Sequence, residues 1–417
     1  MKLTDAEKAM LAGDAGKVRQ KAMELLVRYG EAVGAEKLVA TNNVCGEWTA
    51  IWPLVCEFGL DGPETLALPA VRLLACQLAT SLDSEYWQLQ GATQAQYEAH
   101  ADREVLNVSA GIQRLCTCAP YLASNVPVKG EHCAWAGSAA AVYINSVLGA
   151  RTNRESDKST LAAMLAGRIP CWGLHLPEKR LGTHLVNVVC AVESALDWGL
   201  LGFYTAQLVA AGIPVFNGIR QSPNLVRLKH LSAAASLSDG IGLFHIPGIT
   251  AEVCSLDDAF GGGEPLDVLR FGRVERMLAY DMLNAGAEDS NVDLVILGCP
   301  HCALEELGEI CRLLAGKKIS SNAGLWIFTP RAVKSMADHN GYTCIISGAG
   351  GVLMSDTCPV QGRFMPRSAK VAATNSAKQA KCLSGVGDVQ CWFGSTADCI
   401  AAAVTGYWRG GLNPVVK

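Results

Sequence analysis

The sequence has few charged residues and no long apolar run. Asp, Glu, Lys and Arg make up only 18% of its 417 residues, half of the residues are apolar, and the mean hydropathy is +0.21. No uninterrupted apolar stretch reaches the roughly 20 residues that a membrane-spanning helix needs, so we expect no membrane partner. The apolar excess instead predicts a surface that contacts a partner chain.

Basic blocks and a targeting segment are also missing. The net charge is −4 and no block of Lys and Arg stands out, which argues against nucleic acid as a partner. Residues 1–8 lead directly into an amphipathic helical pattern without a secretory signal. We therefore expect a cytoplasmic, reducing location, where the 17 cysteines are buried thiols, metal ligands or nucleophiles rather than disulfides.

Two cofactor motifs are incomplete. The stretch Gly348-Ala349-Gly350-Gly351 lacks the third glycine of a dinucleotide fingerprint and predicts a turn. Cys299 and Cys302 form a single C-x-x-C with no second pair, which is weak evidence for zinc. A nicotinamide-dependent enzyme and a structural zinc site are therefore both disfavoured.

Helical and strand-like patterns divide the chain into two parts. The first forty residues predict two helices joined through Gly13 to Gly16, and residues 41–113 show an irregular helical pattern. From His184 onward, strand and helix patterns alternate, as parallel β-α-β units require. The expected elements are strands at 185–189, 213–216, 242–246, 292–297, 325–328 and 352–354, and helices through 206–211, over 304–314 and from Pro330.

This alternation predicts an α/β fold of parallel β-α-β sheets with an additional helical N-terminal region. We expect a helical and α/β domain over residues 1–183 and an α/β region with parallel sheets over residues 184–417.

Three cysteines lie beside turn-forming residues near the ends of strand-like runs. Cys299 and Cys358 each follow an expected strand, and Cys118 lies just before a proline. The carboxyl ends of parallel strands form the ligand-binding edge of an open sheet, and a thiolate there is a soft metal ligand. The three residues predict a three-cysteine iron–sulfur site with one open iron, a Lewis acid that can bind a substrate hydroxyl. Cys116 and Cys302 are the neighbours that could substitute, and a buried thiol is the alternative for each cysteine.

Candidate acid–base residues accompany these cysteines in the sequence. Glu131 and His132 are adjacent and follow Cys118 by about one loop, and His301 lies two residues after Cys299. A positioned carboxylate or imidazole is the usual proton acceptor in catalysis. The alternative for each histidine is a satisfied structural group.

Two further segments could bind an anionic substrate. Arg151, Thr152, Asn153 and Arg154 offer guanidinium, hydroxyl and amide donors for a carboxylate or phosphate, although a solvated helix cap would look the same. Ser376 and Lys378 lie where residues 373–378 predict the start of a helix, a generic anion site.

The order of these motifs resembles the large subunit of aconitase X, a branch of the aconitase superfamily. The resemblance implies an iron–sulfur hydro-lyase with an aconitase-like large-subunit architecture. In it, Cys118, Cys299 and Cys358 would bind a cluster of 4Fe-4S, 3Fe-4S or 2Fe-2S type. The matching segments span nearly the whole chain and are residues 3–7, 22–24, 118–122, 125–127, 130–132, 134–135, 145–155, 298–301, 356–358, 373–378 and 393–395.

The resemblance also implies a substrate class and a partner. Known members dehydrate cis-3-hydroxy-L-proline or mevalonate 5-phosphate, and the second group has separate large and small subunits. The chain ends soon after residues 393–395, so we expect the small swivelling domain on a separate subunit, which would also supply the base. Residues 152–155 are similar to the mevalonate 5-phosphate group, which makes this compound the first candidate among small hydroxy acids.

One region departs from the family. Where its members have a histidine-containing substrate loop, this sequence has residues 41–48, and residues 47–110 lose the resemblance. Asn43 in this stretch and Ser138 are further candidate substrate-binding residues. The alternative function is therefore a non-catalytic or specialised large-subunit paralogue that binds a different small acid or a partner chain.

Overall fold

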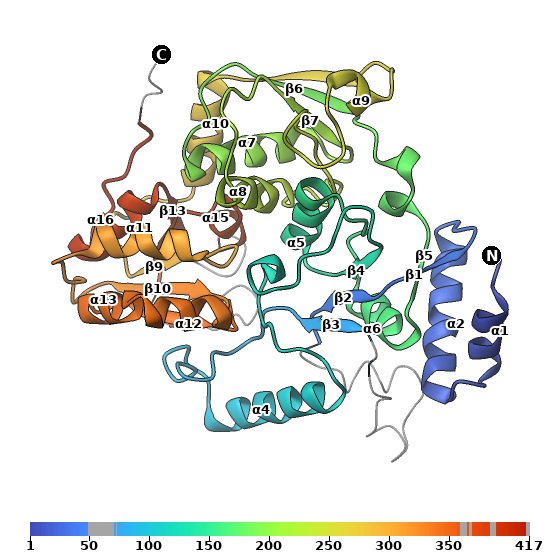
Figure 1. Cartoon of the computed structure of the whole chain (residues 1–417). Helices are drawn as coiled ribbons and strands as arrows, with labels where there is room; N and C mark the ends of the chain where they lie inside the picture. Colours follow the sequence, from blue (N-terminus) through green and yellow to red (C-terminus); the bar gives the residue numbers. More distant parts are fainter. Residues whose placement is uncertain (49–70, 72, 359–364, 367–368, 384–388, 414–417) are drawn as a thin grey trace.

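The computed structural model describes residues 1–48, 71, 73–358, 365–366, 369–383 and 389–413 (Figure 1). Its strands are β1 Leu38–Ala40, β2 Asn43–Gly46, β3 Leu74–Gln77, β4 Cys133–Trp135, β5 Arg168–Pro170, β6 His184–Val188, β7 Pro214–Asn217, β8 Asp267–Phe271, β9 Leu294–Leu297, β10 Gly324–Thr329, β11 Val352–Ser355, β12 Val371–Thr374 and β13 Gln390–Phe393. Its α-helices are α1 Asp5–Ala12, α2 Lys17–Ala32, α4 Gln94–Ser109, α5 Ser138–Tyr143, α6 Asp157–Ala166, α7 Ala195–Leu208, α8 Leu225–Ala235, α9 Leu256–Phe260, α10 Arg273–Asn284, α11 Leu304–Leu314, α12 Arg331–His339, α13 Tyr342–Ala349, α15 Ala377–Leu383 and α16 Thr396–Thr405.

The two predicted N-terminal helices are α1 and α2, which lie at one end of the molecule (Figure 1). Thr4 caps α1 through a capping box, and Gly13 ends it in the left-handed conformation, with φ of 98°. Helix α2 packs against α6, and β1 pairs antiparallel with β5 beside them. The expected helical N-terminal region is therefore confirmed.

The described part of residues 41–113 contains helix α4, as the helical pattern predicts, but also the strands β2 and β3, which that pattern does not predict. Strands β2 and β3 are parallel neighbours, and β4 lies on the other side of β2. Their short sequences, Asn-Val-Cys-Gly and Leu-Ala-Cys-Gln, are almost wholly buried. A strand covered on both faces does not alternate apolar and polar residues, so the periodicity that identifies strands is missing.

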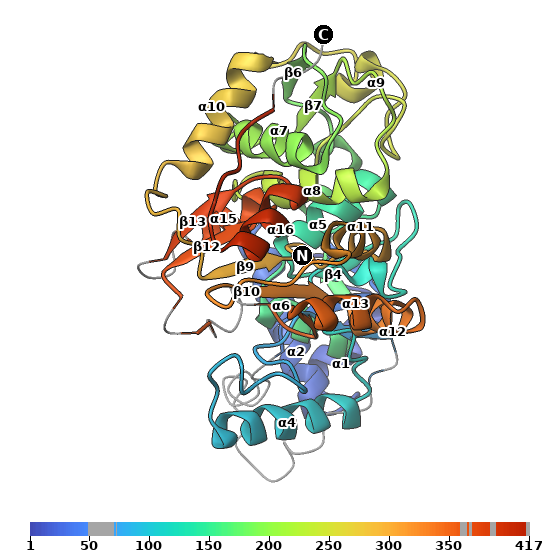
Figure 2. The same ribbon diagram turned by 90° about the vertical axis from the view of Figure 1, so that its left-hand side faces the viewer.

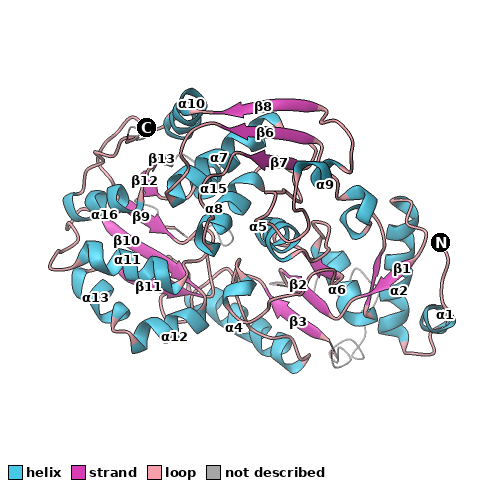
Figure 3. Cartoon of the chain, turned by 45° about the horizontal axis from the view of Figure 1, so that its top comes forward, coloured by secondary structure: helices cyan, strands magenta, loops and turns pink. Residues whose placement is uncertain are grey.

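A second parallel sheet has the order β7-β6-β8, and Figure 3 shows it apart from β2 and β3. The strands expected at 185–189 and 213–216 are β6 and β7. Residues 242–246 do not form a strand, because only His245 makes an isolated bridge, to Val215 of β7. Helix α7 packs chiefly against α8, and no helix among the described residues is long and apolar enough to cross a membrane.

The third sheet, of order β11-β10-β9-β12-β13, is parallel throughout and confirms the predicted α/β fold. One face contributes Val295, Ile327 and Leu353 to a core with α11, α13 and α16, and the other face contributes Ile296 and Phe328 to the largest core. Helices cover both faces, as Figures 1 and 2 show. Helix α11 has the predicted limits, and Pro330 is the N-cap of α12.

Candidate functional site

The carboxyl edge of the five-stranded sheet brings several predicted site residues together. Strand β9 leads to Cys299, β11 leads to Cys358, and β12 leads to Ser376 and Lys378. The strand order reverses between β9 and β12, which are neighbours although β10 and β11 come between them in the chain. A crevice at such a reversal is where open α/β sheets bind ligands.

His301 links the segments that carry all three predicted cysteine ligands. Its imidazole is fully buried, with Nδ1 2.9 Å from Thr117 Oγ1 and Nε2 2.9 Å from the Thr357 carbonyl oxygen. Its backbone N–H donates to Cys118 Sγ at 3.3 Å. Cys118 comes from the N-terminal part of the chain and Cys358 from β11, so the loop after β9 joins them.

A left-handed backbone residue precedes each of the three cysteines. The φ angles are 45° at Cys116, 69° at Asp356 and 105° at Gly298. Asp356 is held by an ion pair with Arg331 and accepts from the Thr80 N–H at its carbonyl, 2.6 Å away. Strained backbone persists where surrounding contacts fix it, and it is most frequent at functional sites.

Replacing Gly298 by alanine is expected to destabilise the protein by about 2–5 kcal/mol, from left-handed strain plus overpacking. An added Cβ would lie 2.2 Å from the Phe328 carbonyl oxygen. Gly316 has φ of 70° with nothing within 4 Å of its would-be Cβ, so Gly316→Ala should cost only about 1 kcal/mol. Urea unfolding of both variants measures the difference, and equal losses would contradict the steric argument.

Cys118, Cys299 and Cys358 are partly exposed residues, whereas Cys116 and Cys302 are buried. Cys302 belongs to the core beneath the sheet, and Cys116 Sγ lies 3.8 Å from a carboxylate oxygen of Glu104. An accessible thiol can reach a cofactor and a core thiol cannot. This difference supports Cys118, Cys299 and Cys358 as ligands over their neighbours.

The thiols are close enough to influence one another. Burial raises the pKa of Cys299, the neighbouring Cys118 and Cys358 raise it further, and Lys378 opposes them. Cys382, a cysteine that the sequence did not single out, adds a smaller increase. Burial also raises the pKa of Cys118, and a bound cation would favour the thiolate form of both Cys118 and Cys299.

Cysteine sulfurs are the donors that iron–sulfur clusters use. In the described part of the chain, no three His, Cys, Asp or Glu side chains are placed to share one metal ion. A cluster does not need such a group, because each cysteine binds a different iron. Three accessible thiols on separate segments therefore match the needs of a cluster.

Lys378 and Ser138 meet although 240 residues separate them in the chain. Lys378 Nζ donates to Ser138 Oγ at 2.7 Å and to Ser236 Oγ at 3.1 Å. The ammonium also lowers the pKa of Cys118, against the larger raising effect of burial. Ser376 Oγ accepts from the Gln379 N–H at 3.1 Å in the first turn of α15.

A buried ion pair that sequence reasoning missed supports the cysteine loop from below. Lys229 on α8 is 1% exposed and pairs with Glu306 on α11. Its Nζ donates to the carbonyl oxygens of Pro300 and His301 at 3.2 and 2.8 Å. Burial raises the pKa of Glu306, but Lys229 and His230 outweigh this and hold it at about 2. The available sequence signal for this pair was the presence of two cationic residues, Arg227 and Lys229, within the apolar pattern of residues 225–235.

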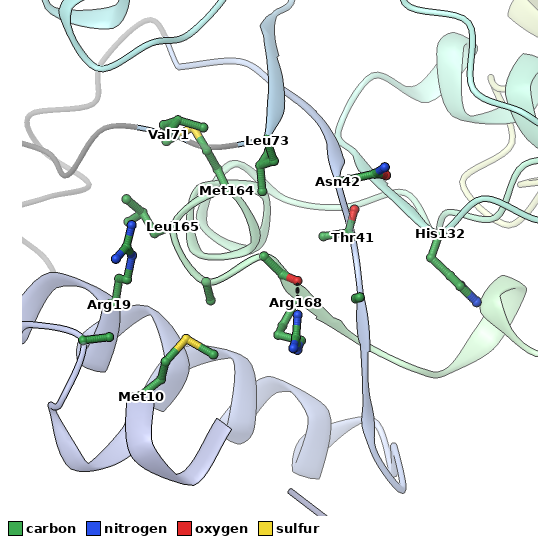
Figure 4. Close-up of a pocket in the computed structure, with 14 residues that line it drawn as sticks. Met10, Arg19, Thr41, Asn42, Val71, Leu73, His132, Met164, Leu165 and Arg168 are labelled. Atoms are coloured by element: carbon green, nitrogen blue, oxygen red, sulfur yellow. Dashed lines mark hydrogen bonds between the residues drawn. The ribbon is translucent and has the colours of Figure 1, made fainter. Parts of the chain in front are cut away.

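The structure places His132 of the predicted pair Glu131 and His132 at a cavity away from the three cysteines. His132 Nδ1 is 2.9 Å from Nδ1 of His175, and Glu131 Oε2 accepts from the Val128 N–H. His132 lines a cavity of about 580 Å³ with residues of α1, α2 and α6 (Figure 4). None of the three cysteines is among the described residues that line it.

The polar side chains of residues 151–154 contact other parts of the protein. The bonds of Arg151 and Asn153 hold the segment before α6 against residues 172–175. The recorded partners are the His175 carbonyl for Arg151, the Asn153 carbonyl for Thr152, the Trp172 carbonyl and Leu174 N–H for Asn153, and Asp239 for Arg154.

Asn43 lies in a closed amide pair rather than an open pocket. Its Nδ2 donates to Asn125 Oδ1 at 2.7 Å, and Asn125 returns a bond at 3.1 Å. Trp135 Nε1 also donates to Asn43 Oδ1. The side chain is 3% exposed, and its amide is fully engaged within the fold.

Acid is expected to destabilise the protein through His175. Burial lowers its pKa to about 3, from 6.5 for an unperturbed histidine. Between these values the unfolded chain binds the proton and the folded chain does not, so stability falls as pH drops below 6.5. From pH 7.5 to 5 the loss is about 2 kcal/mol.

Urea unfolding of the metal-free chain at the two pH values measures this loss. The variant His175→Gln should lose less stability on acidification than the unmodified chain, by about that amount. His339 is exposed on α12 and His339→Gln is the matched control, expected to leave the pH dependence unchanged. An unchanged pH dependence in His175→Gln would contradict the assignment.

Comparison with known proteins gives consistent matches along the whole chain. Models of the aconitase X first, second and third domains match residues 1–178, 182–280 and 292–405. The phosphomevalonate dehydratase large subunit of Methanocaldococcus jannaschii is 36% identical over 392 residues, which cover 91% of this chain and 94% of that protein. The cis-3-hydroxy-L-proline dehydratase of Pseudomonas aeruginosa is 33% identical over 417 residues, 97% of this chain and 70% of that protein. The crystal structure of Thermococcus kodakaraensis aconitase X in its holo form has a TM-score of 0.83 at 31% identity, covering 97% of this chain and all of that one.

Proposed function

The chain belongs to the aconitase X family, and on this premise we propose that it is the large subunit of an iron–sulfur hydro-lyase that removes water from a small hydroxy acid. The observation that carries the proposal is the convergence of Cys118, Cys299 and Cys358. Three accessible thiols from distant parts of the chain meet at the reversal point of a parallel sheet, with His301 bonded to the segments that hold them.

The cluster would be held by the thiolates of Cys118, Cys299 and Cys358. When bound, a cluster with one iron free of cysteine supplies a Lewis acid that makes a hydroxyl a better leaving group. The protein contributes positive charge at this edge through Lys378, and Lys229 lies beneath it. This charge favours the anionic thiolates and an anionic substrate alike.

Lys378 and Ser138 are the proposed contacts for the acid group of the substrate, with Ser376 beside them. An ammonium held by two hydroxyls can exchange one of them for a carboxylate or phosphate oxygen at little conformational cost. Mevalonate 5-phosphate is the proposed substrate, supported by the identity to the phosphomevalonate dehydratase large subunit over nearly all of that protein. Substrate binding by the more distant arginines, Arg151 and Arg154, stays a prediction.

A separate small subunit is proposed to complete the site. Two titratable groups near the cysteines are already engaged, because both nitrogens of His301 are hydrogen bonded and Glu306 is paired with Lys229. Neither can readily accept a proton from a substrate. The names of the large-subunit relatives support a second chain, and we propose that this chain supplies the base.

Anaerobic purification with and without a coproduced small subunit tests the proposal. The large subunit purified by itself should already contain iron and inorganic sulfide. Alkene absorbance should appear from mevalonate 5-phosphate only when both subunits are present. Cis-3-hydroxy-L-proline and a panel of other hydroxy acids are the comparison substrates. Turnover of a comparison substrate without turnover of mevalonate 5-phosphate would refute the substrate assignment. A protein that binds the cluster but turns over none of the substrates would favour the specialised or non-catalytic paralogue.

A further inference from the structure

We propose that His301 is a positioning residue, a neutral crosslink that sets the spacing of the three cysteine sulfurs so that one cluster can bind all of them. This inference rests on the iron–sulfur part of the proposed function. It assigns His301 a role other than the acid–base role that its neighbourhood in the sequence suggests.

The partners of the ring fix its tautomer. The carbonyl oxygen of Thr357 can only accept, so Nε2 carries the proton and donates to it. In the neutral ring Nδ1 is the acceptor, and the hydroxyl of Thr117 donates to it. The same hydroxyl oxygen accepts from the Ala119 N–H at 3.0 Å, which leaves its proton directed at the ring. Every bond in this chain therefore has one donor and one acceptor.

The position of each bond gives His301 direct influence on the cysteines. Thr117 and Thr357 are the residues immediately before Cys118 and Cys358, and His301 itself is two residues after Cys299. A movement of the ring would shift two cysteine-bearing segments relative to the third. The backbone N–H of His301 adds a bond to Cys118 Sγ, the kind of contact that orients a ligand sulfur.

The surroundings prevent the ring from acting as a free acid or base. The side chain has no exposed surface, and both of its nitrogens already have partners. From below, Lys229 bonds the carbonyl oxygens of Pro300 and His301 and holds the loop in place. A proton transfer to substrate would require breaking one of the two links between segments. The geometry therefore favours positioning over catalysis.

Three variants separate the contributions of the ring. His301→Leu keeps much of the volume but makes neither bond, and Thr117→Val removes only the Nδ1 link. His301→Gln offers one amide donor and one acceptor. The matched control is His245→Leu. His245 is also a buried histidine, 1% exposed, and its Nε2 bonds the carbonyl oxygen of Arg180 beside the second sheet.

The measurement is the rate of iron loss to a chelator from anaerobically reconstituted protein, with iron and sulfide content and visible absorbance as further readouts. Removing an outer-shell partner typically weakens metal binding by about 10–100-fold, so His301→Leu should release iron faster by that order. The rate of iron loss from Thr117→Val should lie between the rates of His301→Leu and the unmodified chain. The rate of His301→Gln should stay within a few-fold of that of the unmodified chain. Unfolding by urea reports the stability of each variant separately.

The control decides between positioning and general destabilisation. If His245→Leu is as destabilised as His301→Leu but keeps the rate of the unmodified chain, the positioning role is supported. Equal rates of iron loss in the two variants would overturn it while leaving the proposed function intact. An unmodified chain that binds neither iron nor sulfide would instead refute the cluster itself, and the positioning role with it.

Discussion

Replacing Cys299 by alanine is expected to remove both the cluster and the activity. Cys299 lies near both of the other predicted ligands, since Cys118 and Cys358 both raise its pKa. Loss of one of three protein ligands leaves a further iron without an anchor, so iron and sulfide should fall to background levels. Turnover should drop roughly 10³-fold or more, as when an enzyme loses its main electrostatic catalyst.

Cys302→Ala is the matched control for Cys299→Ala. It lies on the same loop and also loses a sulfur, but its side chain is in the core, 1% exposed. It should keep its iron and most of its activity, with a stability loss of about 1 kcal/mol. Cys118→Ala and Cys358→Ala should behave as Cys299→Ala, and Cys116→Ala as Cys302→Ala. If Cys299→Ala retains iron and Cys302→Ala loses it, Cys302 is the ligand and Cys299 is not.

The ends of the parallel strands were predictable because their signal is local. The apolar run before Cys299 and the acidic first turn of α11 after it each lie within a few residues, and the structure has the helix at its predicted limits. Parallel packing then brings the strand ends to one edge without further information. The grouping of Cys299 with Cys358 follows from this rule alone.

The contacts that complete the site could not be predicted in the same way. His301 bonds to Thr117 and Thr357, which are 184 and 56 residues away, and no local pattern encodes such pairs. His132 shows how little closeness in sequence says about contacts across a loop, because its nearness to Cys118 in the sequence suggested a shared site. Its nearest recorded partner is instead His175, 43 residues further along. Proximity along the chain is informative inside an element and much less so across loops.

The buried pair of Lys229 and Glu306 shows what the site requires of the fold beneath it. Taking two charges out of water costs several kcal/mol for each ion, which their attraction must offset. Here the ammonium also satisfies the carbonyl oxygens of Pro300 and His301, and the carboxylate also accepts from the Ala303 N–H at 2.8 Å. The pair therefore fixes both ends of the loop that follows Cys299, which gives a reason to keep charge in a core.

Lys229→Met is expected to destabilise the protein by about 3–5 kcal/mol, because it leaves the Glu306 carboxylate buried without its main partner. The double variant Lys229→Met with Glu306→Gln removes that charge and should recover a large part of the loss. Lys8→Met is the control, since Lys8 is 63% exposed in its pair with Asp5 and should cost less than about 0.5 kcal/mol.

Urea unfolding of the single and double variants completes a double-mutant cycle for the pair. A coupling energy of several kcal/mol is expected, because removing either partner strands the other in the core. The rate of iron loss adds a functional readout: Lys229→Met frees two carbonyl oxygens beside Cys299, so the loop should hold its sulfur less firmly. If Lys229→Met costs no more than Lys8→Met, the ammonium does not support the loop, and the position of Cys299 must be set by the His301 contacts alone.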